Sequence, residues 1–248
     1  MPAVETTGLT KRYGDVVALS DLSLSVADGE LFGLLGPNGS GKTTTIEILT
    51  GQREPTEGSA SVLGHDPVTD PLAVREAIGI LPEREDPPSF LTPREYLQFV
   101  GDVRTIPDID DRIERWARKL EFRGVLDTLA GDLSEGERQR VMLSQAFVHD
   151  PDLVFIDEPL VNLDPLMQEE VKTHLQEYCA AGNTLFLSTH FMSVAEQLCT
   201  EVGIIADGEL VAQRDPREFE DGGLLDTFVT EVEGSAGTPG APVGVSDE

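Results

Sequence analysis

An octet near the N-terminus constrains this chain more than any other segment. Residues 36–43 read Gly-Pro-Asn-Gly-Ser-Gly-Lys-Thr, which matches the full pattern of a phosphate-binding loop. Its glycines let the backbone turn sharply and bring N–H groups close to phosphate oxygens. The octet therefore predicts a nucleoside triphosphate as the ligand, bound through the loop and the residue after it: Gly36, Pro37, Asn38, Gly39, Ser40, Gly41, Lys42, Thr43 and Thr44.

The segments on both sides of the octet fit this prediction. Residues 30–35 form an apolar run of strand length, and residues 43–49 form a short helical stretch that Gly51 closes. A strand, a glycine turn and a helix N-terminus together make an anion site. Lys42 would then reach the β- and γ-phosphates, and the Thr43 hydroxyl suits Mg²⁺. The alternative is a glycine loop that is merely flexible.

The chain is strongly acidic. Its 248 residues include 46 Asp and Glu against 18 Lys and Arg, a formal net charge of −28. A surface of this sign repels phosphate backbones, so we expect no nucleic-acid partner. The balance is typical of a salt-loaded cytosol, where ions screen self-repulsion. Cys179 and Cys199 lack metal-ligand spacing, and we expect both to be buried and reduced.

The order of the apolar segments predicts an α/β fold. Short β-like pieces surround the loop, at residues 4–9, 16–19, 22–26 and 58–63. From Leu153 onward strands alternate with helices, at residues 153–156, 166–180, 184–188 and 192–199. This alternation is typical of a mainly parallel sheet with helices on both faces.

The region between these two parts has a different character. Residues 92–95, Thr-Pro-Arg-Glu, are a helix-start signature. Ile109, Ile113, Trp116 and Leu120 recur at helical spacing and predict one apolar core face. We therefore expect one folded domain over residues 1–227, with a helical subdomain inserted at about 84–150. Residues 228–248 are rich in Gly, Pro and Ser, and we expect this tail to be disordered.

Two carboxylates, Asp157 and Glu158, follow the apolar run Leu-Val-Phe-Ile at residues 153–156. In an open α/β sheet, ligands bind beyond the C-terminal ends of the strands. The first acid could hold the hydration shell of Mg²⁺, and the second could orient or deprotonate an attacking water. Solvated surface acids are the alternative, and the phosphate-binding loop earlier in the chain favours the functional interpretation.

A second helix start lies at residues 133–140, Leu-Ser-Glu-Gly-Glu-Arg-Gln-Arg. Ser134 and Glu137 have the spacing of a capping box, and capping alone would explain both residues. The functional alternative is a second helix N-terminus at which Ser134 and Gly136 approach a phosphate.

In this order, the motifs resemble the ATPase subunits of ABC transporters, over about residues 4–215. Residues 133–137 are similar to the family's signature motif, and the strand from Leu153 is similar to its Walker B strand. The resemblance implies a P-loop NTPase core, an N-terminal antiparallel β-subdomain and an inserted α-helical subdomain. It also implies that Tyr13 stacks on adenine, that Asp164 lies in the D-loop at the dimer interface, and that His190 contacts the γ-phosphate.

The chain departs from the family pattern in three places. Glu83 stands where the Q-loop glutamine is usual, and Glu135 and Glu137 stand where Gly and Gln are usual in the signature. The D-loop begins Val161-Asn162 instead of Ser-Gly. The acids add negative charge near the phosphates, so we expect closure around ATP to depend on cations. Glu83 could still bind Mg²⁺ or water.

The resemblance implies a mechanism with two ATPase subunits packed head-to-tail around two ATP molecules. Each site takes the phosphate-binding loop from one chain and Ser134, Gly136 and Glu137 from the other. Glu158 acts as the general base, Lys42 and His190 stabilise γ-phosphate charge, and Thr43, Asp157 and Glu83 surround Mg²⁺. The second subunit is a further copy of this chain or a paralogue.

The resemblance also implies a separate transmembrane permease subunit. No apolar run approaches the ~18–20 residues needed to span a bilayer, and the N-terminus lacks a secretory signal. We expect a cytoplasmic chain that docks on the inner face of the cell membrane through about residues 83–100, in a drug- or lipid-type exporter. Two alternatives are a soluble ABC-type ATPase without a membrane partner and a regulatory module that binds ATP without hydrolysis.

Overall fold

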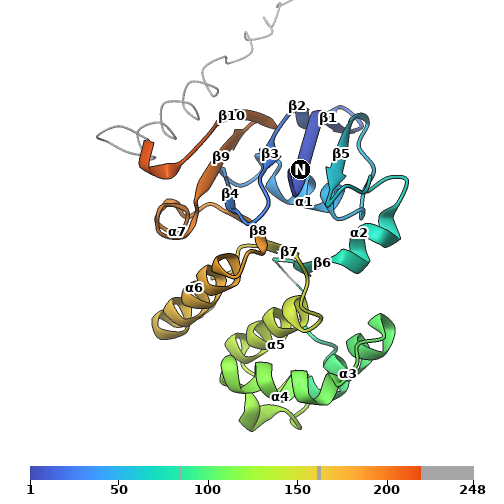
Figure 1. Ribbon diagram of the computed structural model, residues 1–248, viewed down its shortest axis with the longest axis vertical. Coiled ribbons are helices and arrows are strands. Elements are labelled where there is room, and N and C mark those ends of the chain that lie inside the picture. The colour runs from blue at the N-terminus through green and yellow to red at the C-terminus, as the bar shows by residue number, and fades with distance from the viewer. Residues whose placement is uncertain (84, 161–162, 219–248) are drawn as a thin grey trace, which may run out of the picture.

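Two β-sheets of different character occupy the upper part of Figure 1, and helices α3, α4, α5 and α6, all within residues 93–180, lie below them. The computed structural model describes residues 1–83, 85–160 and 163–218. The predictions for Val161-Asn162 and for residues 228–248 concern residues outside these ranges. No helix in the described ranges has both the length and the apolar character to cross a membrane.

The smaller sheet is antiparallel and carries the N-terminus. It consists of β1 (Val4–Tyr13), β2 (Val16–Leu22), β3 (Ser25–Val26) and β5 (Glu57–Val62). Strand β1 pairs with each of the other three. The fold prediction of an N-terminal antiparallel β-subdomain is confirmed.

The predicted strand over residues 22–26 is wrong, because the chain breaks its pairing there. Asp21 has a left-handed backbone, with φ 51°. The Thr6 hydroxyl bridges the break, since it donates to Leu22 O and accepts from Leu24 N, each at 3.0 Å. Strand β2 therefore ends at Leu22, and β3 is reduced to two residues.

The larger sheet has six strands in the order β10-β9-β4-β8-β7-β6. They are β4 (Leu31–Leu35), β6 (Ile78–Leu81), β7 (Leu153–Asp157), β8 (Thr184–Thr189), β9 (Glu201–Ala206) and β10 (Glu209–Arg214). All pairs are parallel except β9 with β10. The prediction of a mainly parallel sheet is confirmed, and the carboxyl ends of β4, β7 and β8 meet at one edge.

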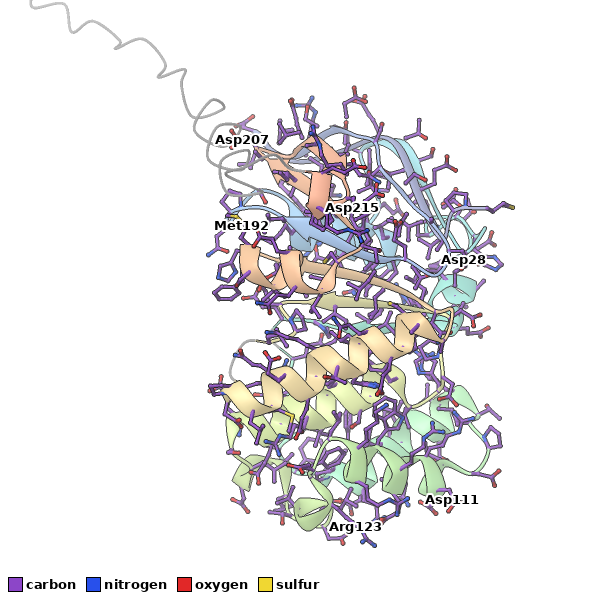
Figure 2. The ribbon with its side chains drawn as sticks, turned by 60° about the vertical axis from the view of Figure 1, so that its left-hand side comes forward. Asp28, Asp111, Arg123, Met192, Asp207 and Asp215 are labelled. Carbon is purple, nitrogen blue, oxygen red and sulfur yellow. The ribbon has the colours of Figure 1, made fainter. Side chains whose placement is uncertain are left out.

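Seven α-helices lie in the described ranges: α1 (Lys42–Leu49), α2 (Pro71–Ala77), α3 (Pro93–Arg104), α4 (Ile109–Lys119), α5 (Glu135–Phe147), α6 (Pro165–Ala180) and α7 (Met192–Leu198). The predicted helix start at residues 92–95 is confirmed, and Thr92 caps α3 through a capping box with Glu95. Helices α3, α4 and α5 form the lower part of Figure 1. Figure 2 shows Asp111 and Arg123 at the tip of this helical part, far from Asp207 at the sheet end.

The larger sheet is covered on both faces. Helices α5, α6 and α7 share one hydrophobic cluster with it. Helix α1 and the antiparallel sheet share the cluster on the other face, so helices cover only part of that face. Phe32, Phe155 and Phe186 stack in this second cluster, with ring centroids 5.1 and 5.3 Å apart.

The predicted apolar stripe on α4 is confirmed. Ile113, Trp116 and Leu120 are buried and Ile109 packs against them. The Trp116 ring lies 5.5 Å from Phe147 of α5 and 4.9 Å from His174 of α6, between ring centroids. This stripe therefore packs α4 against α5 and α6. Both cysteines are free, but Cys179 is only half-buried because it lies near the end of α6.

Gly79 lies at a close approach of β6 to α5 and supports a test of the fold. A Cβ atom at this position would lie 2.1 Å from Ala146 O. Gly79→Ala should therefore lower the free energy of unfolding by about 2–3 kcal/mol, because the backbone must move apart. Gly124→Ala is the control, since a Cβ there meets no atom within 4 Å. Urea unfolding in molar KCl measures both; equal stability of the two variants would contradict the packing described.

Candidate nucleotide-binding site

The loop between β4 and α1 leaves the N-terminus of α1 open to an anion. Gly41 has φ 109°, and a Cβ atom there would lie 2.7 Å from Ala18 O, so only glycine fits. No side chain caps α1, and its first turn contains no acidic residue. The N–H groups of this turn, with the helix dipole behind them, are therefore available to a phosphate.

Lys42 lies inside this loop, with 7% of its surface exposed. Its ammonium group donates to Gly36 O at 2.8 Å and to Pro37 O at 3.2 Å. Burial lowers the pKa of the Lys42 amine, while the charges of nearby carboxylates, Glu158 first, favour the protonated form. A phosphate could take the place of the two carbonyl groups.

Asp157 ends β7 beside the loop and is 3% exposed. One carboxylate oxygen accepts from the Thr43 hydroxyl at 2.9 Å, and the other accepts from the Ser188 hydroxyl. Mg²⁺ in nucleotide sites uses few protein oxygens and completes its shell with phosphates and water. The oxygens of Thr43 and Asp157 fit that requirement. No group of three or more His, Cys, Asp or Glu side chains in the described ranges could hold a metal by itself.

Glu158 follows in a left-handed conformation, with φ 56°, and is 6% exposed. Such a backbone costs on the order of 1 kcal/mol for a non-glycine residue. Its carboxylate accepts from the Thr189 hydroxyl at 3.1 Å, from His190 N at 3.0 Å and from the His190 ring at 2.6 Å. Since an ionised carboxylate can only accept, His190 Nδ1 carries the hydrogen.

These groups surround one cavity of about 610 Å³. The predicted residues that line it are Asn38, Gly39, Gly41, Lys42, Thr43, Thr44, Glu83, Asp157, Glu158 and His190. Two further lining residues, Ala18 and Phe191, were missed by the sequence analysis. The rings of Phe191 and His190 pack with their centroids 3.9 Å apart. Phe191 could have been predicted to line the cavity because it follows His190 in the sequence, whereas nothing in the sequence around Ala18 indicated a role there.

Three other loop residues belong to the same turn but do not line the cavity. Gly36 and Pro37 supply the carbonyl groups that hold Lys42. The Ser40 hydroxyl is buried and finds no hydrogen-bond partner in the described parts of the chain. It is thus a buried, unsatisfied polar group within the loop.

Tyr13 lies away from this cavity, at the end of β1. It is 40% exposed. The Lys11 ammonium and the Arg53 guanidinium form cation–π contacts with its ring, at 5.1 and 5.6 Å from the ring centroid. The contact with adenine remains a prediction for Tyr13.

The signature segment is also separate from the cavity. Ser134 and Glu137 form the predicted capping box of α5. The Ser134 hydroxyl donates to Glu137 Oε2 at 2.8 Å, and the hydrogen bonds from Ser134 lower the pKa of Glu137. Asp164 caps α6 through Leu166 N and Met167 N. Contacts of Ser134, Gly136, Glu137 or Asp164 with a nucleotide or a second subunit remain predictions.

Comparisons with known proteins agree with this geometry. The profile of the family described as "ABC transporter" matches residues 19–161. The Nod factor export ATP-binding protein I of Ralstonia nicotianae is 36% identical over 221 residues, which cover 88% of this chain and 68% of that protein. The probable multidrug ABC transporter ATP-binding protein YbhF of Escherichia coli is 32% identical over 219 residues. The match covers 88% of this chain but only 38% of YbhF.

A solved structure is similar over almost the whole chain. It is described as an ATP-binding subunit of an ABC transporter. The TM-score is 0.85 at 29% sequence identity, and the match covers 93% of this chain and 99% of that one. The fold prediction, a P-loop NTPase core with an added antiparallel sheet and inserted helices, is confirmed.

Lys42 offers a direct test of the cavity as a nucleotide site. Lys42→Met should weaken ATP binding by about 100-fold or more, because a buried charge partner of the phosphates is lost. Lys172→Met is the matched control, since Lys172 is also largely buried but pairs with Glu169 and Gln197 outside the cavity. Fluorescent-nucleotide titration in molar KCl measures both variants. Equal affinities would contradict the assignment of the cavity.

Proposed function

Because the chain belongs to the ABC transporter family and is an ATP-hydrolysing subunit of that kind, we propose that it powers an exporter through a separate membrane permease. The observation that carries this proposal is the single cavity shared by Lys42, Thr43, Asp157, Glu158 and His190. The words "export" and "multidrug" in the names of two relatives support the exporter branch.

In the proposed reaction, the phosphates of ATP occupy the loop before α1. Lys42 leaves its two backbone carbonyl groups and donates to the β- and γ-phosphates. Mg²⁺, held by Thr43 and Asp157 with Glu83 nearby, would neutralise phosphate charge. Glu158 accepts the proton of the water that attacks in line, and His190 donates to the γ-phosphate. The buried carboxylate of Glu158 lines the same cavity as Lys42 and Thr43, which supports this role.

The proposed working unit contains two such subunits. The N-terminus of α5, with Ser134 and Gly136, does not line the cavity of its own chain, and we propose that it serves as the anion site of a second subunit. A second copy could bring this helix end to the γ-phosphate of the first. Ser134 must then release Glu137, to which it donates in this structure. Glu135 and Glu137 would lie beside phosphate, so closure should need cations to screen them.

The permease is proposed to dock beside the helical part, on the inner face of the cell membrane. Phe90, Phe99 and Val103 are 76%, 59% and 68% exposed there. A neighbouring hollow of about 640 Å³ includes Arg75 and Arg104. Both guanidinium groups donate to backbone carbonyls and form no ion pair with a carboxylate of the described residues. Apolar side chains beside unpaired cations suit an amphipathic, acidic segment of a membrane protein.

Glu158→Gln tests the hydrolytic mechanism. The amide cannot accept the proton of the attacking water, so kcat for ATP should fall by about 100-fold or more while ATP binding persists. Glu170→Gln, at a half-buried position of α6 that does not line the cavity, is the control. Phosphate release and nucleotide titration are measured in parallel. Hydrolysis at the wild-type rate would show that Glu158 is not the base.

Arg104→Glu tests the docking surface. The tagged variant should recover much less of the membrane subunit from its host than the wild-type chain, while its basal ATP hydrolysis stays unchanged. Val103→Glu reverses the apolar character of the same surface without touching a buried contact and should have the same effect. Arg118→Glu on α4 is the control. Undiminished recovery of the membrane subunit with both docking variants would rule out this surface.

A further inference from the structure

Two neighbouring hydroxyl groups at the end of β8 contact the two neighbouring carboxylates at the end of β7. Ser188 Oγ donates to Asp157 Oδ1, and Thr189 Oγ1 donates to Glu158 Oε2 at 3.1 Å. The strands are parallel, with Asp157 opposite Ser188 in the register. We propose that Ser188 and Thr189 are positioning residues for hydrolysis, Ser188 for the metal-side carboxylate and Thr189 for the base. This inference rests on the function proposed above for Asp157 and Glu158.

Ser188 is fully buried and fixes one oxygen of Asp157. The other oxygen accepts from Thr43, the second residue expected to hold Mg²⁺. Once Thr43 turns its hydroxyl oxygen to a metal, Ser188 is the hydroxyl that can still hold the plane of the Asp157 carboxylate. The role of Ser188 is therefore to keep one carboxylate oxygen turned toward the phosphate-binding loop.

Thr189 is 1% exposed, so its hydroxyl forms its hydrogen bonds inside the protein. Phe191 N donates to Thr189 Oγ1 at 3.0 Å, so the hydroxyl hydrogen is directed to Glu158. The backbone of Thr189 also accepts from Gly36 N at 3.4 Å. One residue thus connects the phosphate-binding loop, the proposed base and the turn that carries His190.

The contact from Thr189 differs from the contact made by His190. The His190 side chain is 38% exposed and is proposed to turn to the γ-phosphate, which would remove its ring from Glu158. The Thr189 hydroxyl lies inside the sheet edge and can stay. Thr189 is therefore the donor that can keep the Glu158 carboxylate in one direction after the His190 ring has left it.

The alternative is that both hydroxyls only satisfy buried polar groups of the strand. Thr184, at the other end of β8, is a hydroxyl of that kind. It is fully buried, and its Oγ1 accepts from Gly29 N at 2.9 Å, far from both carboxylates. Thr184→Val therefore removes a buried hydroxyl from the same strand without touching the site, and it is the matched control.

The test of Thr189 separates kcat from KM. Thr189→Val should lower kcat for ATP by about 10- to 100-fold, the loss expected for one hydrogen bond to a charged group, with KM changed less than about twofold. Thr189→Ser keeps the hydroxyl and should restore most of kcat. Thr189→Ala replaces the valine variant if the latter does not fold.

The test of Ser188 uses metal binding, with Mn²⁺ as a spectroscopic substitute for Mg²⁺. Electron paramagnetic resonance titration of the chain with a non-hydrolysable ATP analogue should show Mn²⁺ binding about 10-fold weaker in Ser188→Ala. Affinity for the analogue in EDTA should stay unchanged, which separates orientation of Asp157 from damage to the loop.

Thr184→Val is measured in both assays. The proposal fails if the change in kcat caused by Thr189→Val, and the change in Mn²⁺ affinity caused by Ser188→Ala, are no larger than the changes caused by Thr184→Val. It also fails for Thr189 if serine at that position is as inactive as valine. Glu158→Gln is assayed alongside. Wild-type turnover of Glu158→Gln would overturn the proposed base itself, whereas a normal Thr189→Val with an inactive Glu158→Gln would overturn only the positioning role.

Discussion

The parallel pairing of β7 with β8, next to β4, is the constraint on which the site depends. It places Asp157 opposite Ser188 and Leu35 opposite Thr189, so that the phosphate-binding loop, two carboxylates and two hydroxyls meet at one sheet edge. The strands are buried on both faces, which makes a shift of register very costly. The polar groups at their ends gain fixed positions from that apolar packing.

Charge is the second constraint on the chain. A net charge of −28 would repel ATP, and the cavity itself contains Glu83, Asp157 and Glu158. Its attraction for phosphate comes from a few local sources: Lys42, the N-terminus of α1 and the metal that Thr43 and Asp157 can hold. Glu135 and Glu137 add acids at the surface proposed to meet the second subunit. Salt and divalent cations are thus part of the proposed mechanism.

Local motifs in the sequence predicted Lys42, Asp157 and Glu158 because each has a chemical role that requires its residue type at that spacing. The parallel sheet and the α4 stripe followed from periodicity. The hydroxyl contacts of Ser188 and Thr189 could not be predicted, since they depend on register between residues 31 positions apart. The break between β2 and the two-residue β3 was also missed, because Leu22, Leu24 and Val26 alternate with polar residues as they would in one continuous strand.

The central claim is that this chain completes an ATP site only with a second subunit. The most direct test is the solution mass of the Glu158→Gln protein in molar KCl, with and without Mg-ATP. A shift from monomer to dimer that requires ATP is the predicted result, because Ser134 of one copy then meets the phosphates held by Lys42 of the other. A protein that binds ATP and stays monomeric would contradict pairing between copies of this chain.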